Sequence, residues 1–420
     1  MHDRLDGNRV CGSDSARTSE EARMKVIGIS GLENFIDFKK AAWPGLEERE
    51  YRIAQGVDAS AALVIDGNLV VAADQARFCV QTRTAQFPID AIRFCLSEAG
   101  ITIDAIDEIA HGFDFAPYRV LYAQDSVSTE LYRRVLSRSA LLDQVSRDLP
   151  GFPEEKVFAV SHHRAHAACA AFTSGWDECL VVVSDAMGEI EGLSVFDFHD
   201  GELERIRSMY ARDSIGMLYS LVALHLGFEF STDEYKLMEM AAYGDPSRFR
   251  SFFLEAVELR DDGSVRIPLL RLTNTRRDRE ICAAARVSLD QKLVRRRLPG
   301  EPIEFIHEDV AAAMQECFER VILHCCEHFA RETGLRKVVL AGGAPLQAAV
   351  KKKLIRSRFF DVIYISPAGG DDGAALGAAL YRTSLTQAIP ARRPQAPLIT
   401  AWPDAGFDPD LRAPQTSFGS

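Results

Sequence analysis

The chain has 420 residues, of which 47% are hydrophobic and 26% are charged, as expected for a globular protein of two domains or lobes. The formal net charge of −12 argues against nucleic acid as a partner, because a phosphate backbone requires a basic surface. No apolar run reaches membrane-spanning length, so the sequence predicts no membrane partner.

The cysteines and the N-terminal residues indicate a cytoplasmic protein. The nine cysteines include no CxxC pair and have no regular spacing, which favours reduced thiols, most of them buried. Residues 1–23 lack the apolar segment of a signal peptide. We expect these residues to form a disordered extension, and the folded part to begin near Met24.

The first half of the folded part is predicted to consist mainly of strands. Residues 24–30, "MKVIGIS", predict a buried strand, and residues 60–75 predict a hairpin around an Asp-Gly turn. Residues 89–100 have apolar positions at helical spacing and end at a glycine. Residues 106–113 and 155–161 predict two further strands.

Long helices enter the pattern in the second half. Residues 179–206 predict three strands, and residues 214–228 and 309–334 predict amphipathic helices. Residues 337–354 predict a strand that runs through a Gly-Gly pair into a helix. Residues 361–381 predict a strand, a Gly/Asp loop and a helix.

The same order of elements recurs in both halves, with antiparallel strands first and helices later. This order predicts an α/β fold of two lobes with a nucleotide cleft between them. We expect one domain over residues 24–385. Residues 386–420 hold repeated prolines and little periodicity, so we expect an extended or loosely docked tail.

Three of the ten histidines lie within five positions, in "SHHRAHAACAAF". On a helix, His162 and His166 lie one above the other, about 6 Å apart at Cβ, so both imidazoles can reach one ion. Imidazole is a common ligand of zinc and iron. His163 points elsewhere and is better placed to contact a substrate or an oxyanion. The alternative, a pair of hydrogen-bonded core histidines, has about equal weight on this pattern alone.

A two-histidine site usually includes carboxylates, and three aspartates stand at predicted strand ends. Asp185 ends the strand "CLVVVSD", where an unpaired buried charge is unfavourable. Asp371 and Asp372 follow two glycines in "SPAGGDDGAALG", just before a predicted helix. Each alone is explained by helix capping. Together with the histidine pair they favour a metal site.

Two further segments have residues suited to a nucleotide or a phosphate. Gly342 and Gly343 stand between a predicted strand and a helix, where backbone can lie flat against a nucleotide. A tight turn is the simpler explanation of the pair. Lys236, in "DEYKLMEMAAYGDP", has the charge to hold a phosphate, but a solvated lysine on an amphipathic helix is equally consistent.

These motifs together resemble a known family. "HHRAHAACAAF", "VVVSDAMGE", "GMLYSLVALHLGF…DEYKLMEMAAYG", "LAGGAPLQ" and "SPAGGDDGAALGAAL" are similar, in order and spacing, to segments of the O-carbamoyltransferases that modify nodulation factors and antibiotics. The resemblance covers about residues 24–381. It implies the bilobal fold of actin, Hsp70 and sugar kinases.

The resemblance also implies a metal site and a nucleotide site. In the family, two histidines and two aspartates hold a divalent metal, for which we favour Fe²⁺ over Zn²⁺ or Mg²⁺. The matching residues here are His162, His166, Asp185 and Asp371. The residues implied to bind ATP or carbamoyl adenylate are Gly342, Gly343, Gln347 (asparagine in the family pattern) and Asp371, while Lys236 matches a lysine of the family's GEGK segment.

The chain departs from the family pattern near the expected site. Val57 replaces a histidine, while the neighbouring Asp58 is kept. The segment with Arg77 and Phe78 has lost basic residues beside them. Residues 31–55 form an insertion that we expect to cover an acceptor pocket.

The resemblance implies transfer of a carbamoyl group from carbamoyl adenylate to a hydroxyl of a small natural product, as in antibiotic biosynthesis. His163 is then a candidate general base, and Lys236 a second catalytic residue. Typical members continue into a YrdC-like domain that makes the adenylate. Because only the Pro-rich tail follows here, we expect a separate YrdC-like protein to supply it. A homodimer is compatible with the sequence.

Two other functions are consistent with parts of the pattern. The chain is alternatively a non-catalytic, nucleotide-binding partner of a YrdC-like protein, which the altered basic segment favours. The retained metal residues argue against this, because buried ligands are destabilising unless used. A sugar-kinase-type phosphotransferase ranks last, because it has no use for the histidine pair.

Overall fold

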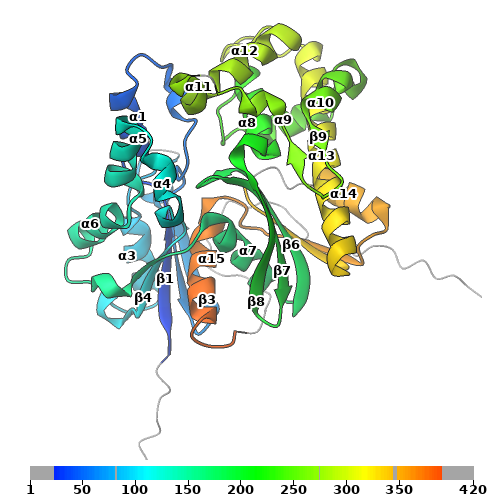
Figure 1. The fold of residues 1–420 in the computed structure, drawn as a ribbon. Coiled ribbons are helices and arrows are strands. Elements are labelled where there is room, and N and C mark those ends of the chain that lie inside the picture. Colours follow the sequence, from blue (N-terminus) through cyan, green and yellow to red (C-terminus); the bar gives the residue numbers. More distant parts are fainter. Residues whose placement is uncertain (1–22, 81–82, 274, 344–347, 390–420) are drawn as a thin grey trace, which may run out of the picture.

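The computed structural model describes residues 23–389 except 81–82, 274 and 344–347 (Figure 1). Residues 1–22 of the expected extension and residues 390–420 of the expected tail lie outside the described residues.

The first lobe is built on a five-stranded sheet with the order β3-β2-β1-β4-β5. Its strands are β1 (Lys25–Ser30), β2 (Ser60–Ile65), β3 (Asn68–Asp74), β4 (Glu108–His111) and β5 (Val157–Ala159). β2 pairs antiparallel with β1 and β3, whereas β4 pairs parallel with β1 and β5. Asp66 and Gly67 both adopt a positive φ, of 50° and 73°, which gives the hairpin the tight turn that the Asp-Gly pair predicts.

The second lobe repeats this topology. Its sheet has the order β12-β11-β6-β7-β8. Its strands are β6 (Glu178–Gly188), β7 (Glu191–His199), β8 (Glu202–Tyr210), β11 (Lys337–Ala341) and β12 (Val362–Ile365). β7 pairs antiparallel with β6 and β8, and β11 pairs parallel with β6 and β12. The two lobes thus share strand order and direction, which confirms the predicted bilobal actin/Hsp70/sugar-kinase-like class.

Helices complete both lobes. Those of the first lobe are α1 (Phe35–Ala42), α2 (Glu48–Tyr51), α3 (Ile89–Glu98), α4 (Arg119–Tyr122), α5 (Ser126–Leu131) and α6 (Arg138–Asp148). Those of the second lobe are α8 (Ile215–His225), α9 (Glu234–Ala241), α10 (Arg250–Ala256), α11 (Arg276–Ile281), α12 (Ala283–Lys292), α13 (Phe305–Thr333) and α14 (Ala348–Ser357). The predicted helix at 309–334 therefore exists but begins four residues earlier, at Phe305.

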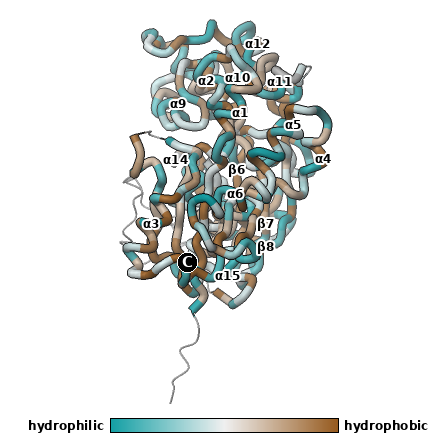
Figure 2. Tube along the Cα trace, turned by 90° about the vertical axis from the view of Figure 1, so that its left-hand side faces the viewer, coloured by the Kyte–Doolittle hydropathy of each residue, from teal (hydrophilic) through white to brown (hydrophobic). Residues whose placement is uncertain are grey.

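Two central helices, α7 (His162–Ser174) and α15 (Asp371–Ser384), lie between the sheets (Figure 1). α7 follows β5 of the first lobe but packs on β6 and β11 of the second. α15 follows β12 of the second lobe but packs on β1 and β2 of the first. Figure 2 shows the hydrophobic residues gathered in the middle of the molecule, around β6 and β7. Each lobe therefore contributes a helix to the other lobe's core.

Small residues allow the two central helices to approach closely. α7 and α15 contribute many buried alanines to one shared core cluster. A Cβ added to Gly377 would lie 1.7 Å from the carbonyl oxygen of Ala165. Glycine is thus required where the helices meet.

The insertion at residues 31–55 bridges the two lobes rather than lying on one. The ammonium group of Lys39 donates to the carbonyl oxygens of Ile53 (2.6 Å) and of Glu280 (3.0 Å), the latter on the second lobe. Glu50 forms a buried ion pair with Arg286 of α12. The insertion therefore holds the lobes together on the side where α1 and α11 meet.

In the part of the chain that the structure covers, every helix is too short or too polar to cross a bilayer.

Alanine at position 377 should weaken the fold, although alanine is the better helix former. The added methyl group must push α15 away from the Ala165 carbonyl. We expect the free energy of unfolding to fall by about 2 kcal/mol, the usual effect of overpacking a core. Urea unfolding of Gly377→Ala and the parent protein measures this. An unchanged or higher unfolding midpoint would contradict the close contact.

The pH dependence of stability should reveal the buried Lys39. Burial lowers the pKa of this ammonium group from its ordinary 10.5 to about 8, against the opposing charges of Glu280, Cys282 and Glu50. The unfolded chain then binds more protons than the folded chain between pH 8 and 10.5. Stability relative to Lys39→Met should therefore rise across this window, by at most about 3 kcal/mol. A difference that stays constant with pH, measured by denaturant unfolding, would refute the lowered pKa.

Candidate metal centre

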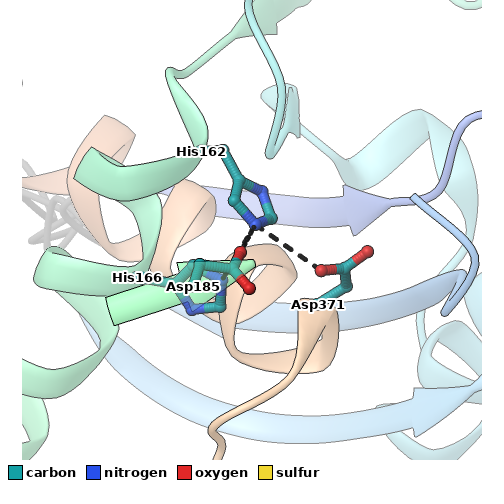
Figure 3. A group of neighbouring side chains, drawn as sticks. All are labelled: His162, His166, Asp185 and Asp371. Atoms are coloured by element: carbon teal, nitrogen blue, oxygen red, sulfur yellow. Dashed lines mark hydrogen bonds and ion pairs between the residues drawn. The ribbon is translucent and has the colours of Figure 1, made fainter. Parts of the chain in front are cut away.

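Two imidazoles and two carboxylates converge where the central helices begin (Figure 3). His162 and His166 come from α7, Asp185 from β6, and Asp371 from the first turn of α15. One potential ligand atom from each residue lies within 4.8 Å of the others. The structure thus brings together the four residues that the sequence singled out.

The individual distances centre on His162. Its Nε2 lies 3.0 Å from Oδ2 of Asp185, 3.5 Å from Oδ1 of Asp371 and 3.0 Å from Nε2 of His166. His166 Nε2 is also 3.9 Å from Oδ2 of Asp185. Both imidazoles are almost completely buried.

The surroundings of His162 fix its tautomer. Nδ1 lies 3.0 Å from the carbonyl oxygen of Gly112, which can only accept a hydrogen bond, so Nδ1 carries the hydrogen. Phe113 stacks on the ring with the centroids 4.2 Å apart and holds its plane. In a neutral imidazole, Nε2 then carries no hydrogen, and its lone pair points at carboxylate oxygens. Such an arrangement is repulsive unless a cation lies between the atoms.

The pKa shifts within the cluster also show that a positive charge is favourable there. Burial lowers the pKa of His162, but the hydrogen bond that its ring donates to Asp185 and the charges of Asp371 and Asp185 outweigh it and raise the pKa to about 9. Burial and the charge of His162 lower the pKa of His166 to about 3. Burial and the charge of Asp185 raise the pKa of Asp371 to about 6, with His162 opposing. A proton held on His162 occupies the place that a metal cation suits.

The donor set fits a divalent transition metal. Two neutral imidazoles and two ionised carboxylates carry a charge of −2, which a divalent cation balances. Mixed nitrogen and oxygen ligands are typical of zinc and non-haem iron, whereas Mg²⁺ prefers oxygen ligands and water. The residues therefore fit Fe²⁺ or Zn²⁺ better than Mg²⁺.

Glu189, which the sequence did not single out, positions the start of α7. Its Oε1 accepts hydrogen bonds from the backbone N–H groups of His162 (2.9 Å) and Asp114 (2.7 Å). The side chain is buried in the turn between β6 and β7, and this burial raises its pKa to about 7. Glu189 follows Asp185 by four residues in "SDAMGE", but a turn residue gives no periodic signal from which this contact follows.

His163 lies away from the cluster, in a polar network on the other side of α7. Nδ1 is 2.7 Å from Oγ of Ser194 and 3.6 Å from Oε2 of Glu191, and the ring is fully buried. Burial holds the pKa of His163 well below its ordinary value. The ring does not line the pocket beside the cluster, so the structure shows no contact that supports the predicted role of a general base.

A pocket opens beside Asp185 and Asp371, lined by residues of both lobes. Residues 54–58, which include the last two residues of the insertion, form one wall, and Met187, Phe230 and Ser231 form another. Val57, which replaces the family's histidine, therefore faces this pocket. The insertion therefore borders this pocket through its last two residues.

Arg83 is the one cation among the described residues that line this pocket. It forms an ion pair with Asp58 and donates to the carbonyl oxygen of Ser231 and, at 2.6 Å, to Oγ1 of Thr232. The guanidinium thus joins the first lobe to the second beside the cluster. The sequence did not reveal it, because residue 83 lies in no periodic element.

The Gly-Gly segment lies next to the cluster. Gly342 has a φ of +98°, and a Cβ there would lie 2.2 Å from the carbonyl oxygen of Ser184. A Cβ on Gly343 would lie 3.3 Å from Oδ1 of Asp185. The segment thus brings bare backbone close to Asp185 of the cluster. Gln347 lies outside the described residues.

Lys236 is not part of the pocket lining. Its ammonium group pairs with Asp233 at 2.8 Å, and its side chain is 40% exposed. The structure therefore leaves its predicted catalytic role without a contact to the cluster. Asp372, next to Asp371, is not in the cluster either, and burial and the charge of Asp74 raise its pKa to about 7.

Comparison with known proteins gives a family match. A family model described as "Carbamoyltransferase N-terminus" matches residues 122–380. Nodulation protein NolNO of Sinorhizobium fredii is 32% identical over 84% of this chain and 50% of its own length. Nodulation protein NolO of Bradyrhizobium diazoefficiens is 34% identical over 59% of this chain and 42% of its own length. The chain spans about half the length of the curated relatives it matches.

Solved structures are similar only loosely. Component A of (R)-2-hydroxyglutaryl-CoA dehydratase from Acidaminococcus fermentans has a TM-score of 0.43 and 14% identity, over 86% of this chain and 99% of that one. Full-length HypF in its phosphate- and nucleotide-bound form has a TM-score of 0.36 and 15% identity, over 71% of this chain and 41% of that one.

Two substitutions of Glu189 should separate its hydrogen bonds from its charge. Glu189→Gln keeps an acceptor for the N–H groups of His162 and Asp114, so affinity for Zn²⁺ should change little. Glu189→Ala removes the acceptor and should weaken Zn²⁺ binding by about 10- to 100-fold, as loss of a supporting contact does. Competition with a chelating dye measures both. Equal affinities in the two variants would contradict this role.

Proposed function

The chain belongs to the carbamoyltransferase N-terminus family, and from this premise we propose that it transfers a carbamoyl group from carbamoyl adenylate to a hydroxyl of a small molecule. The observation that carries the proposal is the convergence of His162, His166, Asp185 and Asp371 on one point beside a pocket. The acceptor class is inferred from the nodulation proteins among the relatives, and a natural product is the acceptor that we favour.

The four clustered residues would hold a divalent cation, with Fe²⁺ favoured. When bound, this cation supplies Lewis-acid polarisation of the carbamoyl carbonyl or of the adjoining phosphate. Arg83 provides a further positive charge in the same pocket, where the adenylate phosphate requires one. The backbone of Gly342 and Gly343 supports an adenine nucleotide beside Asp185.

The reaction forms one carbon–oxygen bond and breaks another. The acceptor oxygen attacks the carbamoyl carbon, the bond from that carbon to the phosphate oxygen breaks, and AMP leaves. The acceptor's proton goes to a carboxylate, because His163 does not line the pocket. Asp58 lines the pocket, so we assign it this role, with its ion pair to Arg83 released when the guanidinium turns to the adenylate phosphate.

Carbamoyl adenylate, the proposed donor, has to be made from carbamoyl phosphate and ATP by a YrdC-like activating unit. We propose that this chain receives the adenylate from such a unit. The rival function, a nucleotide-binding subunit without catalysis, would bind ATP but would not convert carbamoyl adenylate.

Single-turnover transfer with carbamoyl adenylate and a panel of hydroxylated sugars tests the proposal. His166→Ala should lose its metal, as measured by mass spectrometry, and its transfer rate should fall by about a hundredfold or more. His199→Ala is the matched control, because His199 is exposed and outside the cluster. Unchanged metal content and rate in His166→Ala would refute the metal site. ATP binding without AMP release from the adenylate would instead support the non-catalytic subunit.

A further inference from the structure

A second groove lies on the second lobe, with a lining separate from that of the pocket beside Asp185. It has a volume of about 500 Å³ and forms where β8, the hairpin of β9 (Glu258–Leu259) and β10 (Val265–Arg266), and the turn at 268–271 meet. In the described part of the chain, it shares no lining residue with the pocket beside Asp185. Its volume is within the range of small-molecule sites.

Arginines dominate the lining of this groove. The four are Arg207, Arg260, Arg266 and Arg271, contributed by three separate segments. Two carboxylates, Asp213 and Asp262, also line it, so four guanidinium groups against two carboxylates leave a formal charge of +2. Glu258, 3.6 Å from Arg266 at the rim, reduces this to +1. A positive groove is unexpected on a chain whose net charge is −12.

The two aspartates are already engaged within the protein. Asp213 accepts hydrogen bonds from both sides of the Arg271 fork and, at 3.0 Å, from the backbone N–H of Ile267. Asp262 accepts from the backbone and hydroxyl of Ser264 and is 3.8 Å from Arg207. These contacts occupy Arg271 and Arg207, so the excess positive charge of the groove lies on Arg260 and on Arg266.

Some arginine hydrogen-bonding capacity is unused. Arg260 is exposed and has no carboxylate within ion-pair distance among the residues that the structure covers. The Nε of Arg207 is buried without an acceptor among the same residues. Hydroxyl groups of Ser208 and Tyr210 add further donors to the lining. The groove is thus rich in donors and poor in free acceptors.

We propose that this groove is a second anion site and takes the phosphate group of a small organophosphate. Guanidinium forks match phosphate oxygens in pairs, and an anion suits the excess positive charge. The site is independent of the proposed carbamoyl transfer, since it uses none of the residues assigned to that reaction.

Calorimetric titration with inorganic phosphate, at physiological ionic strength, tests the site. The double variant Arg260→Gln/Arg266→Gln should bind phosphate at least about tenfold more weakly than the parent protein, because two charge-assisted contacts are lost. Both side chains are exposed, so the variant should unfold at the parent's temperature. Arg336→Gln, an exposed arginine that does not line the groove, is the matched control and should bind as the parent does.

Citrate distinguishes phosphate from carboxylate as the recognised group. Weaker binding of citrate than of phosphate supports the proposal, and tighter binding of citrate overturns the phosphate assignment. Equal phosphate affinity in the parent and the double variant overturns the site itself. So does the absence of measurable phosphate binding by the parent protein.

Discussion

The close crossing of α7 and α15 is the constraint on which the site depends. Gly377 lets the backbone of α15 approach the Ala165 carbonyl, one residue before His166. Because of this approach, Asp371 at the start of α15 comes within 3.5 Å of His162 at the start of α7. Bulkier side chains at the crossing would separate the two helix starts, and with them the imidazoles from a carboxylate.

Around this crossing, the surrounding residues hold the imidazoles in a defined orientation. The Gly112 carbonyl fixes the tautomer of His162, and Phe113 fixes its plane. Glu189 caps the first backbone N–H of α7 from the turn of the opposite lobe. The cluster is therefore built from segments of both lobes, and neither lobe alone would contain it.

Local patterns in the sequence predicted the parts of this arrangement that are themselves local. The histidine pair follows from helical spacing, and Asp185 and Asp371 follow from a charge at the end of an apolar strand and from a Gly/Asp loop. The hairpins and the later helices of each lobe follow from local patterns, whereas the strand order was not predicted. Glu189 and Arg83 were missed, because their contacts join segments distant in the chain and leave no periodic trace. The contacts of His163 with Ser194 and Glu191 were not predicted either, because a helical wheel does not show which residues of other elements face a side chain.

The connections of α7 and α15 have a mechanical consequence. Each helix is joined by the chain to one sheet and packed against the other, so any rotation of the lobes must shear one helix past its neighbour. The same rotation would shift α7, β6 and α15 relative to each other at the cluster, to which all three contribute residues. An ion bound there would oppose this motion, because its ligands come from all three segments. The distances between the ion and its ligands would therefore change if the lobes rotated.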